Sequence, residues 1–236
     1  MRSIIVFTVH KAASMLLYEL TKWITGTCQM PFYSINDRTF PERELRTDAS
    51  AFLDKEGCFC PIRYDVDVPH IENYDLILHL RDPRDAMTSA FYSFAYSHPP
   101  NPGRKNASDA QRQEWIRQGV DWHVLKRSSA WLRNYEAYCD HILKQPNTLF
   151  VKYEEMVTDF ESWLRKYIAP FPLAHPEGTI QKLVHKYRNN FEVPSEDVYR
   201  HKRQITPGDH KRKLKPETIA TLNEKFKDVL EALGYE

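Results

Sequence analysis

An arginine and a serine eight residues apart are the side chains with the clearest chemical use in this sequence. Arg81 follows the apolar run 75–80, which we expect to be a buried strand, and Ser89 lies about two turns into the helix expected next. An arginine at a strand's carboxyl end and a hydroxyl on the following helix can converge on one anion. The motif also fits an exposed arginine beside a helix start, with Asp82 as the cap and Pro83 in the first turn.

A second candidate anion site lies where the first strand meets the first helix. We call residues 10–15 the first turn; it contains His10, Lys11, Ala12, Ala13, Ser14 and Met15. Backbone N–H groups and the helix dipole attract anions at a helix start, and Lys11 adds a charge there. The pattern Gly-x-x-x-x-Gly-Lys-Ser/Thr is absent, so the turn is not a nucleotide-hydrolase P-loop. A plain turn with a surface lysine and a capping Ser14 is the alternative interpretation.

The elements that must position these side chains follow from the hydrophobic pattern. Short apolar runs alternate with longer amphipathic runs, which predicts an α/β fold with three layers, a mostly parallel central sheet flanked by helices. We expect strands at 3–9, 32–36, 58–63, 75–80 and 148–152, and helices at 14–24, 84–96, 110–118, 124–142, 155–167, 179–189 and 216–233. In such sheets ligands bind beyond the carboxyl ends of the strands, where both anion sites would lie. The sequence therefore favours a ligand with phosphate groups at both ends.

Composition limits the other possibilities. A chain of 236 residues suits one domain, 1–236, and a net charge of +1 gives no overall attraction to nucleic acid. The four cysteines show no disulfide spacing, and the first apolar run is too short for a signal peptide, so we expect a cytoplasmic protein. No apolar run approaches the roughly 20 residues of a membrane span. We expect no metal.

Several segments, taken in order, resemble the sulfotransferases that use 3′-phosphoadenosine-5′-phosphosulfate (PAPS). They are the first turn, the run 81–89, the segment 149–156, the segment 203–211 and the last helix with its Gly234 end. The resemblance spans nearly the whole chain, and it is most specific at the first turn and at 81–89. It implies a P-loop-like sulfotransferase fold.

The resemblance also implies roles for individual residues. Lys11, Ala12, Ala13, Ser14 and Met15 would bind the 5′-phosphosulfate, Arg81 and Ser89 the 3′-phosphate, Arg203 and Gln204 would cover that phosphate, and Tyr153 would lie near the adenine with Phe191 as an aromatic partner. Lys11 would stabilise the charge on the bridging oxygen as the sulfuryl group leaves. The segment 190–215 would be a basic lid, and 97–126 a variable insert on the acceptor side. The chain departs from the family pattern at Ala13, Gln204 and Ile205, where glycine, lysine and glycine are usual, and at His210, where tryptophan is common.

A general base would assist an acceptor hydroxyl that attacks sulfur. Asp37, after the second expected strand, is the first choice, although Asn36-Asp37-Arg38 also suits a turn. His10 stands where proline is common in the family and could reach the transferred group. His70 is a further candidate, in the region after the third expected strand that also contains Asp65 and Asp67.

The sequence therefore predicts an enzyme that transfers a sulfuryl group from PAPS to the hydroxyl of a small molecule or glycan and releases adenosine 3′,5′-bisphosphate (PAP). One alternative is a P-loop kinase of a small metabolite, which would need magnesium and a glycine-rich turn. The other is a nucleotide-binding module without catalysis, and the family departures leave it open. The acceptor and the oligomeric state cannot be predicted from these residues.

Overall fold

The computed structural model describes residues 2–37, 55–97, 109–192 and 205–235. The chain divides into two compact units. The first unit contains residues 1–81 and 137–190, and the second contains residues 82–136 and 191–236.

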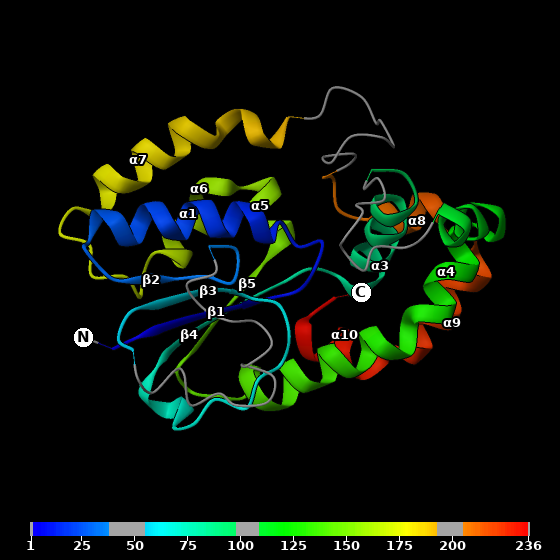
Figure 1. Ribbon diagram of the computed structural model, residues 1–236, viewed down its shortest axis with the longest axis horizontal. Coiled ribbons are helices and arrows are strands. Elements are labelled where there is room, and N and C mark those ends of the chain that lie inside the picture. The colour runs from blue at the N-terminus through cyan, green and yellow to red at the C-terminus, as the bar shows by residue number, and fades with distance from the viewer. Residues whose placement is uncertain (1, 38–54, 98–108, 193–204, 236) are drawn as a thin grey trace. The chain divides into compact units, whose positions relative to one another are not determined.

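The first unit is built on a five-stranded sheet in the order β2-β3-β1-β4-β5 (Figure 1). Its strands are β1 (Ile4–Thr8), β2 (Phe32–Tyr33), β3 (Cys58–Ile62), β4 (Asp75–Leu80) and β5 (Thr148–Lys152). All four strand pairings are parallel. Every residue of β1 and of β3 is buried, as expected for parallel strands that are covered on both faces. The predicted α/β fold with a mostly parallel sheet is confirmed.

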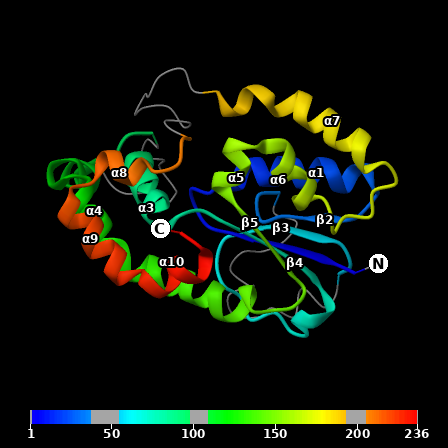
Figure 2. The ribbon, with the colours of Figure 1, turned by 180° about the vertical axis from the view of Figure 1, so that it is seen from behind.

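Helices cover the two faces of this sheet. On one side lie α1 (Ser14–Thr27), α5 (Tyr153–Thr158), α6 (Phe160–Tyr167) and α7 (Pro176–Tyr187), as both views show (Figures 1 and 2). The π-helical turn η4 (Tyr138–Leu143) contacts β4 and β5. The ring of Tyr138 meets Phe7 edge-on at 6.0 Å, and its hydroxyl donates to the carbonyl oxygen of Thr8 at 2.7 Å. A short 3₁₀ turn, η2 (Ile71–Asn73), precedes β4.

The second unit is helical where it is described. It contains α3 (Pro83–Tyr92), the π-helical turn η3 (Ser93–Ser97), all but the last residue of α4 (Asp109–Ala137), α8 (Asp209–Lys213), α9 (Pro216–Lys225) and α10 (Lys227–Leu233). Within α4 the backbone leaves the helical conformation at Gly119, whose φ of 83° suits a residue without a Cβ. Helix α8 contacts α3 and α9.

Several predicted boundaries were wrong for local reasons. The predicted helix 155–167 is two helices, because Asp159 leaves the helical conformation (φ −145°) and its side chain accepts a hydrogen bond from Ser162 N at 3.1 Å, capping α6. The predicted helix 216–233 divides at Phe226, and the strand expected at 32–36 is only Phe32–Tyr33.

The predicted lid also contains regular structure. The described part of 190–215 contains helix α8. The 3₁₀ turn η5 (Arg188–Phe191) overlaps the start of this segment. The helices expected at 110–118 and 124–142 are α4, with its break at Gly119, followed by η4. The single-domain assignment, the acceptor-side role of 97–126 and the lid role of 190–215 stay predictions.

Candidate functional site

The first turn has an unusual backbone for residues that carry side chains. Lys11 and Ala13 have φ values of 69° and 56°, in the left-handed region. That conformation costs a non-glycine residue about 1–2 kcal/mol and persists only where the surroundings enforce it. Alternating left-handed and ordinary residues is also the arrangement in which successive N–H groups converge on an anion. The turn therefore has the backbone geometry of an anion site although it lacks glycine.

The start of α1 differs from the alternative interpretation of this segment. The cap residue is Ala13, with no side-chain cap, and the first helical hydrogen bond runs from Leu17 N to Ala13 O at 3.1 Å. Ser14 is the first helical residue, so its hydroxyl is not occupied in capping the helix. Met15 is 46% exposed and His10 is exposed.

Arg81, which the sequence predicts to bind an anion, contacts the first turn within the first unit. Its guanidinium is buried, and Nη1 donates to the carbonyl oxygen of Lys11 at 3.0 Å. The guanidinium carbon lies 4.4 Å from the centre of the Tyr153 ring, which is itself buried. This cation–π contact orients the arginine. The fold thus brings Lys11, Arg81 and Tyr153 together, although they are far apart in the sequence.

Sequence reasoning missed one cation beside the first turn. Arg63 follows the last residue of β3, and its Nε donates to Ser14 Oγ at 2.9 Å. Its terminal nitrogens donate to Asn36 Oδ1 at 3.3 and 3.4 Å. The signal was present in the sequence, because Arg63 follows its strand just as Arg81 follows β4.

Asp37, the first choice for the general base, is paired at the surface. Its carboxylate accepts a hydrogen bond from the Tyr18 hydroxyl and forms an ion pair with Lys22 Nζ at 2.9 Å. The bonds from Tyr18 and then from Lys22 lower the pKa of the carboxyl. A lower pKa makes a weaker base at neutral pH. The base role of Asp37 stays a prediction, and this pairing counts against it.

Among the other candidates for the base, His10 lies in the first turn, whereas His70 and Asp65 lie elsewhere in the first unit. His70 is exposed, with Nδ1 3.6 Å from Glu72 Oε1. Asp65 pairs with His141 at 2.9 Å. Neither pair involves a residue of the first turn, and the base role of His70 stays a prediction.

In the second unit, the start of α3 follows the capping pattern expected from the sequence. Asp82 accepts a hydrogen bond from Arg84 N at 2.8 Å, and Pro83 is the first helical residue. The side chain of Arg84 is buried, pairs with Asp82 Oδ2 at 2.7 Å and donates to Asn223 Oδ1 at 2.6 Å. Ser89 lies in α3, half-buried, whereas Arg81 belongs to the first unit.

Asp85 attaches the late segment of the chain to α3. Its Oδ2 accepts from Gly208 N at 2.8 Å, and its Oδ1 accepts from His210 N at 2.8 Å. Oδ1 also lies 2.6 Å from His210 Nδ1. Both side chains are fully buried. The carboxylate thereby satisfies backbone N–H groups at the start of α8, where His210 replaces the tryptophan usual in the family.

Replacing Asp85 with asparagine is expected to destabilise the protein by about 1–3 kcal/mol, because an amide nitrogen cannot accept the hydrogen bond from Gly208 N. Urea unfolding at pH 7 measures this change. Asp121→Asn is the matched control: Asp121 Oδ1 accepts from Lys215 N at 2.9 Å, and an asparagine oxygen can keep that bond. An equal loss of unfolding free energy in both variants would mean that the three hydrogen bonds to Asp85 stabilise the fold no more than the single bond to Asp121.

Arg203 and Gln204 lie outside the described residues. Phe191, the suggested partner of Tyr153, is the last residue of η5 and belongs to the second unit. The predicted roles of these three residues and of Ser89 stay predictions. Among the described residues, no group of three or more His, Cys, Asp or Glu side chains could hold a metal ion.

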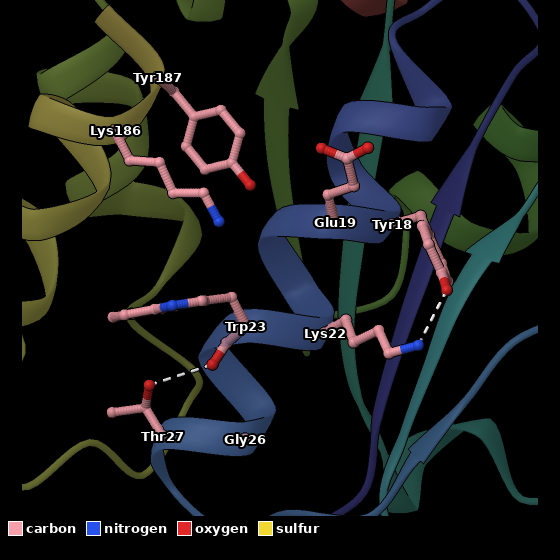
Figure 3. A pocket seen from close by; sticks show the side chains of 8 residues that line it. All are labelled: Tyr18, Glu19, Lys22, Trp23, Gly26, Thr27, Lys186 and Tyr187. Carbon is pink, nitrogen blue, oxygen red and sulfur yellow. Dashed lines mark hydrogen bonds between the residues drawn. The ribbon is translucent and has the colours of Figure 1, made fainter.

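An open groove of about 590 Å³ lies between α1 and α7 in the first unit (Figure 3). Lys186 and Tyr187 point from α7 toward the side of α1 that carries Trp23, whereas Lys22 extends away from them toward Tyr18. All the residues that line the groove belong to these two helices. None of them is a predicted donor-site residue. None of the described helices is long and apolar enough to cross a bilayer.

Comparison with known proteins gives two findings. A profile described as "Sulfotransferase domain" matches residues 71–234. No curated protein matches the sequence at a significant level. The matched range includes Arg81, Ser89 and Tyr153, whereas the first turn precedes it.

The fold resembles solved structures of low sequence identity. A crystal structure of mouse sulfotransferase SULT7A1 complexed with PAP aligns with a TM-score of 0.64 at 17% identity, over 97% of this chain and 84% of that chain. A structure of retinol dehydratase in complex with androsterone and inactive cofactor PAP aligns with a TM-score of 0.51 at 16% identity, over 97% and 80% of the two chains. At these identities the likeness establishes the fold.

Proposed function

The chain belongs to the sulfotransferase family, and we propose that it transfers a sulfuryl group from PAPS to an acceptor hydroxyl and releases PAP. The observation that carries the choice of donor is the 3.0 Å hydrogen bond from Arg81 to the carbonyl oxygen of Lys11. It joins the residue proposed for the 3′-phosphate to the turn proposed for the 5′-phosphosulfate. A donor that carries one anion on the 3′ position and another on the 5′ position of the same ribose fits that arrangement.

The residues of the first unit fit such a donor. The left-handed Lys11 and Ala13 give the first turn the backbone of an anion-binding nest. The start of α1 adds the positive end of a helix dipole, and Arg63 adds a cation beside Ser14. Arg81 supplies a buried guanidinium that can bind two phosphate oxygens, and Tyr153 holds its plane.

Sulfuryl transfer needs alignment of the reacting groups and stabilisation of the charge that develops on the leaving oxygen. The logic is that of phosphoryl transfer, in which positioning and electrostatics carry most of the catalysis. We assign the charge stabilisation to the Lys11 ammonium and the backbone N–H groups of the first turn. Arg81 would hold the 3′-phosphate of the donor. Asp37, His10 and His70 remain candidates for the base.

The acceptor is proposed at the level of its chemistry, as a hydroxyl of a small molecule or glycan. Because the chain belongs to the sulfotransferase family, we no longer consider the kinase alternative. We also propose a cytoplasmic location, because all four cysteines are free thiols, as is usual in a reducing compartment.

Calorimetric titration of PAP, without added magnesium, tests the donor site. We expect wild-type protein to bind PAP and Arg81→Ala to bind at least tenfold more weakly, because a buried charge-assisted phosphate contact is lost. ADP should bind much more weakly than PAP, since it lacks the 3′-phosphate.

The control is Arg165→Ala, which removes an arginine of the same unit that pairs on the surface with Glu161 and Glu177. This variant should keep the wild-type affinity. ADP binding as tight as PAP, or binding that requires magnesium, would contradict the proposed donor.

A further inference from the structure

His79 is a buried histidine that the proposed chemistry does not use. It lies in β4 and is fully buried. Its strand partner is Thr8, the last residue of β1, so His79 stands at the end of that strand, two residues before the first turn. Its ring meets the Trp163 indole edge-on, with 5.5 Å between ring centres. Burial lowers the pKa of His79 to about 3, and a contact with the backbone of Ala12 opposes that shift.

The contact with Ala12 identifies which backbone atom faces the ring. A neighbour that favours the protonated imidazole must accept a hydrogen bond, so it is the carbonyl oxygen of Ala12 and not its N–H. The alignment is poor, because neither ring nitrogen of His79 has a partner of ordinary hydrogen-bond geometry among the described residues. Hydrogen bonds that support a site are often loose before the ligand binds and tighten afterwards.

Arg81 repeats this contact one residue earlier in the first turn. It follows His79 by two positions, so the alternation of a strand places both side chains on one face. Arg81 Nη1 donates to the carbonyl oxygen of Lys11. The end of β4 thus hydrogen-bonds the carbonyl of Lys11 through Arg81, and the ring of His79 stands beside the next carbonyl, that of Ala12.

Holding these two carbonyls determines where the next two amides point. In a planar trans peptide the C=O and the following N–H point in opposite directions. When β4 holds the carbonyls of Lys11 and Ala12, the N–H groups of Ala12 and Ala13 are directed away from the strand. With Lys11 and Ala13 left-handed, these amides can face one anion.

The buried polar groups around His79 lower the stability of the folded protein, which argues that His79 has a role other than packing. Thr8 Oγ1 and Trp163 Nε1 are also buried without a hydrogen-bond partner among the described residues. Each such group destabilises the folded state relative to an apolar group of the same shape. Local rules of stability are typically broken at functional sites. A leucine at position 79 would avoid this cost.

We propose that His79 is a positioning residue, whose ring N–H holds the carbonyl of Ala12 so that the amides of the first turn face the anion. The identity of that anion, the phosphosulfate of PAPS, rests on the proposed function. The effect on the turn itself does not.

Three measurements on His79→Leu test this assignment. Urea unfolding at pH 7 should show unchanged or increased stability, because the polar group is removed from an apolar site. Hydrogen exchange of a peptide covering residues 9–17 should be at least threefold faster, because a carbonyl of the turn is released. PAP affinity should fall about tenfold. His79→Gln, which keeps an N–H donor, should restore slow exchange and most of the affinity.

Thr21→Val is the matched control in the same layer of the first unit. The buried Thr21 hydroxyl bonds to the Tyr167 hydroxyl at 2.5 Å, so this variant should lose stability while turn exchange and PAP affinity stay at wild-type values. The proposal is overturned if His79→Leu loses stability and affinity together, or leaves exchange unchanged. If wild type fails to bind PAP but exchange rises in His79→Leu and recovers in His79→Gln, the positioning role stands and the proposed donor is wrong.

Discussion

Replacing Lys11 with alanine is expected to lower kcat by 10²–10³ while PAP affinity changes only a few-fold. The ammonium stabilises the charge that develops on the bridging oxygen as the bond between this oxygen and the sulfuryl sulfur breaks. Removing one such preorganised group typically lowers kcat by about 10²–10³. The release of PAP from saturating PAPS, with water or an identified acceptor taking the sulfuryl group, measures the rate.

The folded state should tolerate this change. Lys11 is half-buried, and alanine already occupies the other left-handed position of the turn, Ala13. Lys166→Ala is a suitable control, because Lys166 is a surface lysine of the same unit paired with Glu155. If Lys11→Ala instead weakened PAP binding and left kcat unchanged, Lys11 would be a ground-state ligand of the donor.

Stability is expected to fall steeply as the pH decreases from about 6.5 toward 3, with His79 as one identified cause. Burial lowers the pKa of His79 to about 3 in the folded state, whereas an unfolded histidine takes up a proton near pH 6.5. Over that range the unfolded state binds one proton more than the folded state. Stability that is present above pH 6.5 is therefore lost on acidification, by about 1.4 kcal/mol per pH unit.

Urea unfolding at pH 7, 6, 5 and 4 tests this. His79→Leu should reduce the slope of the unfolding free energy against pH by the amount that corresponds to one bound proton. His123, buried in the second unit, has its pKa lowered to about 4 by burial and then by Arg127. His123→Leu should therefore reduce the same slope by a further proton, over the narrower range from about pH 6.5 to 4. Thr21→Val should lower stability equally at every pH. An unchanged slope in His79→Leu would show that the folded protein already protonates this ring.

The sequence was most informative where one strand or one helix determines the outcome. The runs that became β1, β3 and β4 are apolar because these parallel strands are covered on both faces, and the parallel arrangement of the sheet was predicted. The helix start at Asp82 and Pro83 was likewise predicted, because a cap and its helix are neighbours in the chain. The divisions at Asp159 and Phe226 were missed because a hydrophobic pattern continues through a short break.

The parts of the candidate site that were missed depend on register between distant strands. Arg63 contacts Ser14, and His79 faces Ala12, only because β3 and β4 flank β1 with their carboxyl ends aligned. Neither contact follows from residue type or spacing. The base was hard to predict for a related reason: Asp37 looked available in the sequence, and its partners Tyr18 and Lys22 come from α1.

The alanine at position 13 has a consequence for how the first turn meets a ligand. A glycine there would have many accessible conformations, whereas Ala13 has fewer in the unfolded chain and is held by its surroundings in a left-handed state that costs it about 1–2 kcal/mol. Much of the conformational entropy of the turn is therefore lost during folding, before any ligand arrives. A donor that binds has little disorder left to remove, so more of its contact energy remains as affinity.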